Sequence, residues 1–170
     1  MAVRRRSPSR PLRRRGDRFP DAGRQFHLTF FTERRTRHLK PFPLSRIVVR
    51  ALMASDAEAL TTTLAYAVLP DQVQWLFVLR DFTLLREPVR RVKARTAREI
   101  VPRIFLPGPL WQPAFAEDRP PDRAAAEASA AAIIRAPVRH GHADRAGDWP
   151  HWDTALPDVL EALAAEEALR

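Results

Sequence analysis

The sequence predicts an α+β fold, a ferredoxin-like antiparallel sheet with helices packed on one face. Three observations lead to this prediction. Strand and helix patterns follow one another in the order strand, helix, strand, strand, helix, strand, helix, which suits such a layer. Apolar residues make up 45% of the 170 residues, enough for a packed core in about one domain. No internal repeat divides the chain.

The first predicted elements are a strand and a helix. Residues 25–32 are rich in β-branched and aromatic side chains, as strands are. Pro41 and Pro43 interrupt the chain after it, and Ser45 is a candidate cap for a helix over residues 46–58. Apolar side chains recur on one side of that helix, so we expect it to pack against the sheet.

Two further strands and a basic helix follow. Residues 61–69 and 73–79 are apolar runs separated by Pro70-Asp71-Gln72, which predicts neighbouring strands of a well-buried sheet. Residues 84–104 have the pattern of a basic amphipathic helix. Pro88 is placed in its first turn, where proline is tolerated.

The remaining elements are shorter. A turn at Pro107-Gly108-Pro109 precedes a predicted short last strand at residues 110–115. Residues 123–134 are alanine-rich and should be helical, with Pro137 limiting the helix. A short helix is expected over residues 156–170.

Charge divides the chain into three parts. We expect residues 1–22 to form a disordered basic arm, residues 23–156 the folded domain, and residues 157–170 an acidic helix or tail. The first 24 residues hold nine arginines against two aspartates and so carry +7 of the net charge of +9. Such an arm is expected to order on phosphate. A solvated tail without a partner is the alternative.

Arginine rather than lysine carries the positive charge, since Lys40 and Lys93 are the only lysines. The guanidinium group binds phosphate through two parallel hydrogen bonds, so a nucleic-acid partner is expected first. Arginine enrichment from a GC-rich genome is the competing explanation.

Several function classes are disfavoured by composition. The chain has no cysteine, which removes disulfides, thiolate metal sites and thiol nucleophiles. No apolar run reaches the ~20 residues of a membrane span, and no apolar segment follows the basic start as in a signal peptide. We expect a cytoplasmic protein that does not bind membranes.

One segment carries a family resemblance. Leu69-Pro70-Asp71-Gln72-Val73-Gln74-Trp75-Leu76, which follows Tyr66-Ala67-Val68, resembles the core motif of single-tyrosine HUH transposases, in particular the REP-associated tyrosine transposases of bacteria. Other stretches resemble the same family in the same order: Phe26-His27-Leu28-Thr29, Val92-Lys93-Ala94-Arg95-Thr96-Ala97-Arg98, Gly108-Pro109-Leu110-Trp111-Gln112-Pro113-Ala114-Phe115, Pro137-Val138-Arg139-His140-Gly141 and Gly147-Asp148-Trp149-Pro150-His151-Trp152-Asp153. The resemblance covers residues 11 to 156, so residues 23–156 are interpreted as a transposase-like domain.

The resemblance implies a specific chemistry. In that family a tyrosine hydroxyl attacks a phosphorus of single-stranded DNA and forms a 5′-phosphotyrosine. Two histidines one residue apart on a strand share a face and hold Mg²⁺ or Mn²⁺. A third ligand, usually a carboxamide, follows the tyrosine by four residues, one helical turn further on.

This chain departs from the family at each of these positions. Gln72 and Gln74 stand in place of the histidines, and alignment through Pro137 puts Ala132 at the nucleophile and Ala136 at the third ligand. Alanine neither attacks phosphorus nor binds metal. We therefore expect no bound metal cofactor and no intact catalytic residue, which leaves enzyme activity uncertain and points to a catalytically dead copy.

Two other groups are candidate replacements for the missing catalytic residues. Tyr66, the only tyrosine, is interpreted as a packing residue rather than a substitute nucleophile. His140 and His142, with Asp144 nearby, have ligand spacing, but surface histidines are the favoured interpretation.

The binding residues of the family have counterparts here. In the arm and just after it, candidate contacts to phosphate or guanine are Arg13, Arg14, Arg15, Arg18 and Arg24. On the basic helix, candidate phosphate contacts are Arg90, Arg91, Lys93, Arg95 and Arg98, with a solvated charged face as the alternative. Trp111 is expected in the core rather than as a base-stacking platform.

The favoured hypothesis is a DNA-binding protein related to these transposases that binds hairpin or single-stranded DNA with palindromic repeats, associates with the nucleoid and does not cut strands. The first alternative is an active transposase or endonuclease with a rearranged site. The second is an arginine-rich module that binds RNA or acidic proteins. A monomer and a homodimer are both compatible with the sequence.

Overall fold

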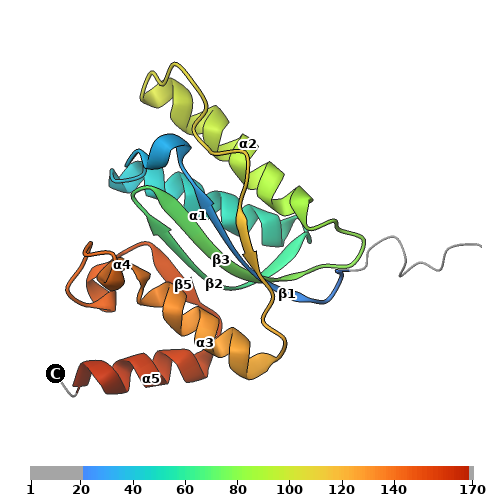
Figure 1. Ribbon diagram of the computed structural model, residues 1–170, viewed down its shortest axis with the longest axis vertical. Helices are drawn as coiled ribbons and strands as arrows, with labels where there is room; N and C mark the ends of the chain where they lie inside the picture. The colour runs from blue at the N-terminus through green and yellow to red at the C-terminus, as the bar shows by residue number, and fades with distance from the viewer. Residues whose placement is uncertain (1–20, 169–170) are drawn as a thin grey trace, which may run out of the picture.

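The computed structural model describes residues 21–168, and its centre is one five-stranded sheet (Figure 1). The strands are β1 (Gln25–Phe31), β2 (Thr61–Leu69), β3 (Gln72–Leu79), β4 (Ala116–Asp118) and β5 (Trp152–Thr154). They lie in the order β4-β1-β3-β2-β5, and every paired neighbour is antiparallel. The α+β antiparallel fold expected from the sequence is confirmed.

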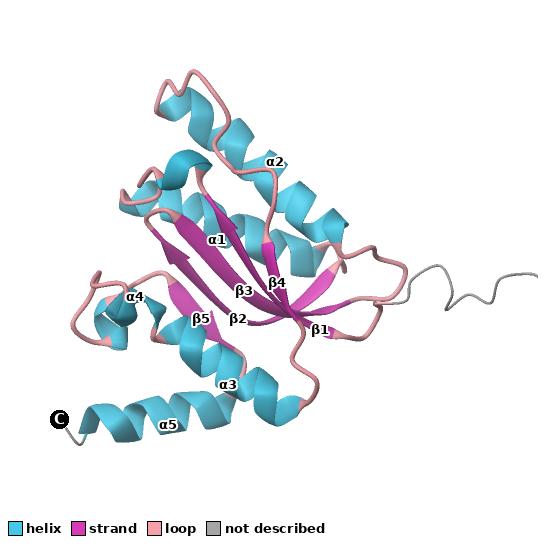
Figure 2. Ribbon diagram, viewed as in Figure 1, coloured by secondary structure: helices cyan, strands magenta, loops and turns pink. Residues whose placement is uncertain are grey.

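Helices cover both faces of this sheet (Figure 2). The helices are α1 (Phe42–Ala57), α2 (Arg86–Arg103), α3 (Arg123–Ile134), α4 (Ala136–Arg139) and α5 (Pro157–Ala168), with short 3-10 turns η2 (Glu33–Arg35) and η3 (Ala146–Asp148). One apolar cluster joins α1 and α2 to the sheet, and a second joins α3, α4 and α5 to the opposite face. The expectation that the helices pack on one face only is therefore wrong.

The reason lies in the two central strands, which are apolar on both sides. Along β2, Tyr66 and Val68 point into the cluster under α1, while Ala65 and Ala67 point into the cluster under α3. The small side chains of Ala65 and Ala67 allow α3 to approach the sheet through its own buried alanines, Ala126 and Ala130. A sheet whose strands read as continuous apolar runs is typically covered on both faces.

The first helix begins earlier than predicted. It starts at Phe42 and takes Pro43 into its first turn, where a missing N–H costs no hydrogen bond. Ser45 is fully buried inside the helix and does not cap it. Its hydroxyl donates to the carbonyl of Leu39 at 2.6 Å and fixes the entering loop.

The short last strand also differs from the prediction for residues 110–115. In that segment Trp111 makes an isolated bridge to Thr32, and the strand proper is β4, which pairs with β1. Trp111 is a core residue, as expected. Its Nε1 donates to Oγ1 of Thr96 at 2.9 Å, and its ring meets Phe30 edge-on at 5.1 Å.

The other predicted strands and helices agree with the observed ones to within a few residues. The predicted arm lies outside the described residues except for its last two positions. At the other end, α5 packs through Val159 and Leu163 onto the cluster that contains α3. No helix within residues 21–168 has the length and hydropathy that a membrane span requires.

Candidate nucleic-acid interface

Strand register places the two glutamines on the face covered by α3 and α4. Gln72 lies opposite Leu69, and Gln74 lies opposite Ala67. Directly opposed residues of an antiparallel pair share a face, and both Leu69 and Ala67 belong to the α3 cluster. On the other side, Gln74 faces Thr29 of β1. We call Gln72, Gln74 and the β1 residues paired with them, Phe31 and Thr29, the glutamine face.

Both carboxamides are nearly buried. Gln72 is 3% exposed and Gln74 is 6% exposed. Nε2 of Gln72 lies 3.4 Å from Nε2 of His140, at the long limit of a hydrogen bond. The Gln74 side chain has no hydrogen-bond partner among residues 21–168.

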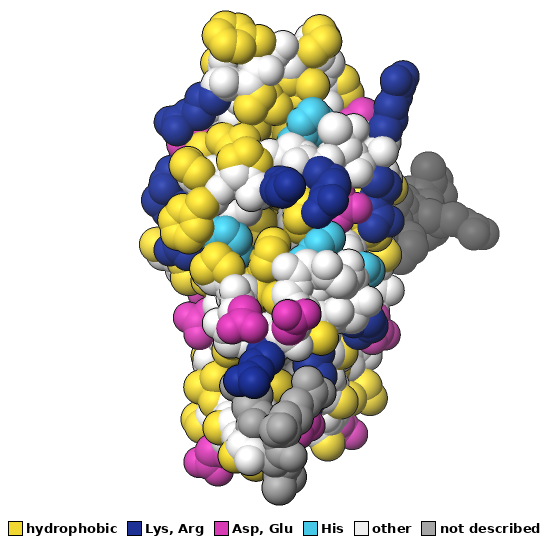
Figure 3. Space-filling view, turned by 90° about the vertical axis from the view of Figure 1, so that its left-hand side faces the viewer, with side chains coloured by type: hydrophobic (Ala, Val, Ile, Leu, Met, Phe, Trp, Pro, Cys, Tyr) yellow, Lys and Arg dark blue, Asp and Glu magenta, His cyan; other side chains and the backbone are white. Residues whose placement is uncertain are grey.

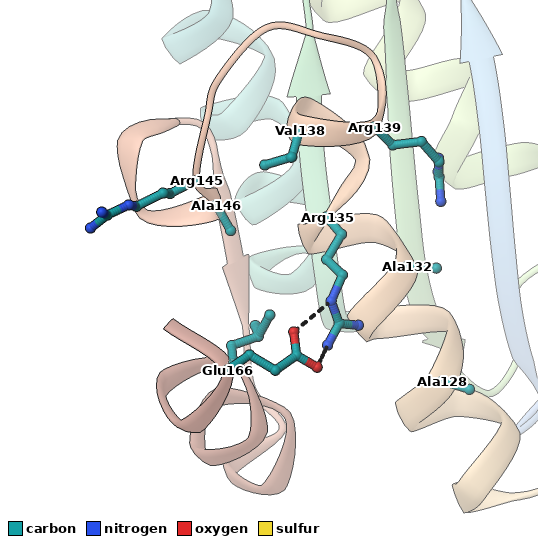
Figure 4. A pocket seen from close by; sticks show the side chains of 9 residues that line it. Ala128, Ala132, Arg135, Val138, Arg139, Arg145, Ala146 and Glu166 are labelled. Atoms are coloured by element: carbon teal, nitrogen blue, oxygen red, sulfur yellow. Dashed lines mark hydrogen bonds and ion pairs between the residues drawn. The ribbon is translucent and has the colours of Figure 1, made fainter. Parts of the chain in front are cut away.

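The helices above this face carry the two alanines singled out by the sequence. Ala136, at the start of α4, is fully buried in the same cluster as Leu69. Ala132 on α3 is half-buried and lines a cavity of about 440 Å³ (Figure 4). Its other lining residues are Ala128, Arg135, Val138, Arg139, Arg145, Ala146, Leu163 and Glu166. A methyl group thus stands at each helix position where the resemblance implies a reactive or ligating side chain.

The three arginines of the cavity point in different directions. Arg135 points inward and donates two hydrogen bonds to Glu166 of α5, at 2.5 and 3.2 Å. Arg145 points away, while Arg139 extends from α4 toward the strands of the sheet (Figure 4). Arg139 is exposed and makes no ion pair within the described chain. Its charge is therefore available to the glutamine face.

The charge of Arg139 affects the pKa of His27 on β1. Nε2 of His27 is buried without a hydrogen-bond partner in the described structure. Burial lowers the pKa of His27 most strongly; Asp118, opposite it on β4, opposes this shift, and Arg139 adds to it. The lowered pKa favours a neutral imidazole at this place, with the positive charge left to Arg139.

A second arginine is held at the end of β1 by a strained turn. Arg34 and Arg35 have φ of 54° and 56°, in the left-handed region that costs a non-glycine residue ~1 kcal/mol or more. Nε of Arg35 lies 2.8 Å from Oδ2 of Asp71, and its guanidinium lies 4.2 Å above the ring of Phe31. Phe31 opposes Gln72, so this cation borders the same face.

Histidine, arginine and hydrophobic side chains gather on the side of the molecule that carries α4 (Figure 3). The rings of His140 and His142 stack at 6.3 Å, and that of Trp149 lies 5.7 Å from His142. Burial, and then Arg37, lower the pKa of His142. Within residues 21–168, no group of three or more His, Cys, Asp or Glu side chains is arranged to hold a metal ion.

Most candidate arginines of α2 are already paired with glutamates. Arg90 and Arg91 both donate to Glu87, and these bonds lower the pKa of Glu87 to about 2. Arg91 also donates to Glu58, at the end of α1, as does Arg95. These bonds partly neutralise the helix and hold it to α1.

Lys93 and the remaining candidates have different surroundings. The ammonium of Lys93 donates to the carbonyls of Gln112, Pro113 and Ala114 at 2.8, 3.3 and 3.0 Å, and burial lowers its pKa. A phosphate contact by Lys93 would have to replace these bonds. Arg24 and Arg98 are exposed and have no ion pair among the described residues. Outside the described residues lie the arm candidates Arg13, Arg14, Arg15 and Arg18.

Tyr66 lies on the opposite side of the sheet from the glutamines. It is 6% exposed and belongs to the cluster under α1 and α2. Burial raises the pKa of its phenol, and the charge of Asp153 raises it further. The phenol is therefore both remote from the glutamine face and hard to ionise.

The glutamine face does not offer the donors that a divalent cation prefers. Its two carboxamides are neutral, Ala136 has no donor atom, and Arg139 brings positive charge toward the same strands. The carboxylate of Asp118 has one oxygen engaged by the backbone N–H of Arg119, and Asp71 is paired with Arg35. The residues present do not fit Mg²⁺ or Mn²⁺.

Gln72, Gln74 and Ala136, which the resemblance assigned to one site, lie on the same side of the sheet, but sequence reasoning missed two further residues near this face. Arg139 lies in the segment that begins at Pro137 and resembles the family, yet nothing in the sequence indicated that its side chain extends toward the sheet. Arg35 was missed because its position depends on the strained turn after β1.

Comparison with known proteins agrees with this architecture. The chain is similar to a solved REP-associated tyrosine transposase bound to a REP hairpin, with a TM-score of 0.67, 21% identity, and coverage of 96% of this chain and 88% of that chain. It has a weaker likeness, with a TM-score of 0.49 and 19% identity, to a proposed transposase from Deinococcus radiodurans R1, covering 70% of this chain and 91% of that one. No protein-family model and no curated protein sequence matches the chain. The protein thus shares its fold with the REP-associated tyrosine transposase.

Proposed function

We propose that the protein is a relative of the REP-associated tyrosine transposases that binds hairpin or single-stranded DNA and does not cleave it. The observation that carries this proposal is the side-chain set of the glutamine face. Gln72 and Gln74 lie on the strand, and Ala132 and Ala136 lie on the helices above it. Binding groups surround this face, but reactive groups are missing from it.

Support for DNA binding comes from charge and fold. The net charge of +9 is carried almost wholly by arginine, which binds phosphate well. Arg24, Arg98 and Arg139 are exposed and have no ion pair within the described chain. The solved protein of the same fold is bound to a REP hairpin. Hairpin DNA is therefore the proposed ligand, and a location at the nucleoid follows from it.

Support for the absence of cleavage comes from the chemistry that strand transfer needs. A nucleophile must reach phosphorus, and developing charge must be stabilised by a metal or an equivalent. The methyl of Ala132 provides no nucleophile, and neutral carboxamides are weak metal ligands. We propose that the protein holds no catalytic metal and is a pseudoenzyme.

An active enzyme with a rearranged site is the second candidate, and Tyr66 is the group that it would use. The position of Tyr66 disfavours it, since the phenol lies under α1 rather than near the glutamine face. A third candidate is an arginine-rich module for RNA or acidic proteins, which the fold does not favour.

A binding experiment separates these candidates. Affinity is measured by fluorescence anisotropy at several salt concentrations for a DNA hairpin with a single-stranded flank, a DNA duplex of equal length and an RNA hairpin. The proposal expects the DNA hairpin to bind most tightly, with log affinity falling steeply against log salt. Equal affinity for all three would show that hairpin recognition is wrong.

A further inference from the structure

Gln74 carries a largely buried amide that has no protein partner among the described residues, although its polar atoms keep some contact with solvent. It is 6% exposed, it sits in the centre of the sheet, and its side chain has no hydrogen bond among the described residues. Buried amides are nearly always hydrogen-bonded, because transfer from water without compensation is unfavourable. An amide in a central strand that reaches solvent and has no protein partner is open to a ligand that supplies the partner atoms.

Gln72 adds a second carboxamide beside it. The two residues are separated by one position along β3, so their side chains lie on the same face about 7 Å apart. The side chain of Gln72 contacts His140 at 3.4 Å, a distance too long to hold the amide firmly. Together the two side chains present up to four N–H donors on one face.

The charge around these donors favours an anion. Arg139 extends toward the strands, is exposed and has no ion pair in the described chain, and its charge acts on His27. Arg35 borders the face at Phe31, although Asp71 neutralises it. Asp118, opposite His27, is the carboxylate that opposes an anion here, and it is engaged by the backbone of the next residue.

We propose that the glutamine face binds a phosphodiester of DNA directly, without a divalent cation. The amides of Gln72 and Gln74 donate to the two non-bridging oxygens, and the guanidinium of Arg139 supplies the balancing charge. This inference rests on the proposed DNA binding and names the site at which one backbone phosphate is held. Glutamine suits this role because its side-chain amide has two N–H donors, whereas a neutral imidazole has only one.

The first test observes the amides themselves. Side-chain amide signals of ¹⁵N-labelled protein, assigned with Gln72→Ala and Gln74→Ala, are followed by NMR during titration with a four-nucleotide thymidine oligomer in EDTA. Both signals are expected to shift with one common affinity. Unmoved signals at saturating oligomer, or shifts that appear only when Mn²⁺ is added, overturn the inference.

The second test introduces a negative charge at Gln74. Gln74→Glu keeps the size of the side chain but replaces donors by a negative charge, and it should weaken oligomer binding about tenfold or more. Gln25→Glu is the matched control, because Gln25 lies on the same face opposite Val78, roughly 13 Å along the strand from Gln74. A change below about twofold is expected there. Equal effects of the two variants contradict a site at Gln74.

Three further outcomes are informative. If inorganic phosphate moves the amide signals and the oligomer does not, the face is a free-phosphate site and the DNA assignment is wrong. If the oligomer leaves the amides unmoved while the DNA hairpin still binds the protein, the inference fails and the proposed function stands. If neither DNA binds, the proposed function itself fails. Circular dichroism of Gln74→Glu checks folding, and the wild-type NMR titration does not depend on that variant.

Discussion

Nε2 of Gln72, on the central strand β3, lies 3.4 Å from Nε2 of His140, the residue that follows α4. This contact joins the sheet to the segment that carries Arg139. The glutamine face therefore has strand residues on one side and, on the other, the cation Arg139, which has no ion pair among residues 21–168.

Arg139 should contribute one phosphate contact. Arg139→Ala is expected to reduce the slope of log affinity against log salt by about 1 for a DNA hairpin, since each neutralised phosphate releases counterions. Arg145→Ala is the control, because Arg145 lines the same cavity but points away from the sheet. Identical slopes for the two variants would mean that Arg139 does not touch DNA.

Lys93 should matter more for stability than for DNA. Lys93→Met removes three hydrogen bonds to the loop at residues 112–114, and we expect the free energy of unfolding to fall by about 1–3 kcal/mol. Arg98→Met, on the same helix and exposed, should change it by less than about 0.5 kcal/mol. Urea unfolding measures both. If Lys93→Met leaves stability intact and instead removes DNA binding, Lys93 is a phosphate contact after all.

Glu87 links stability to pH. Its pKa in the folded protein is about 2, below the ordinary value of 4.5 for a glutamate, so the folded state holds the proton less tightly than the unfolded state. The stabilisation is therefore complete above pH ~4.5 and is lost as pH falls toward about 2. Because its arginine partners are largely exposed, Glu87→Gln should cost only about 0.5–1 kcal/mol at pH 7.

The difference between wild type and Glu87→Gln should then shrink in unfolding experiments at pH 5, 4 and 3. Glu99→Gln is a suitable control, because the arginine contacts of Glu99 are longer, at 3.5 and 3.8 Å. A difference that is constant over this range would rule out a lowered pKa for Glu87.

The phenol of Tyr66 should ionise at a higher pH than an ordinary tyrosine. Tyr66 is the only tyrosine in the chain, so absorbance at the phenolate band reports it alone. Burial and Asp153 raise its pKa, and the folded protein is expected to ionise above pH 10, with a return toward the ordinary value in denaturant. A midpoint below 10 in the folded protein would revive Tyr66 as a nucleophile.

The sequence was informative where pattern and packing coincide. The β2–β3 hairpin is two long apolar runs around Pro70-Asp71, and α2 has a clear helical period, so both were predicted nearly to the residue. Ala132 and the glutamines were assigned to one site by family resemblance, and register places Gln72 and Gln74 on the face that α3 covers.

The rest depends on partners distant in sequence. Strands β4 and β5 have three residues each, and β4 is wholly exposed, so their hydrogen-bonding neighbours define them rather than a pattern of their own. The pairing of Arg91 and Arg95 with Glu58 joins two helices and leaves no trace in the α2 segment. Likewise, the alanines of α3 predict a helix but not the face of the sheet that it covers.

We propose above that the protein holds hairpin DNA and leaves it intact. The direct measurement uses an end-labelled DNA hairpin with a single-stranded flank, incubated with the protein in Mg²⁺, Mn²⁺ or EDTA and analysed on native and denaturing gels. We predict a retarded complex under all three conditions that separates under denaturation into free protein and full-length DNA. A protein–DNA adduct that survives denaturation, or a shortened strand that appears only with metal, would contradict the account.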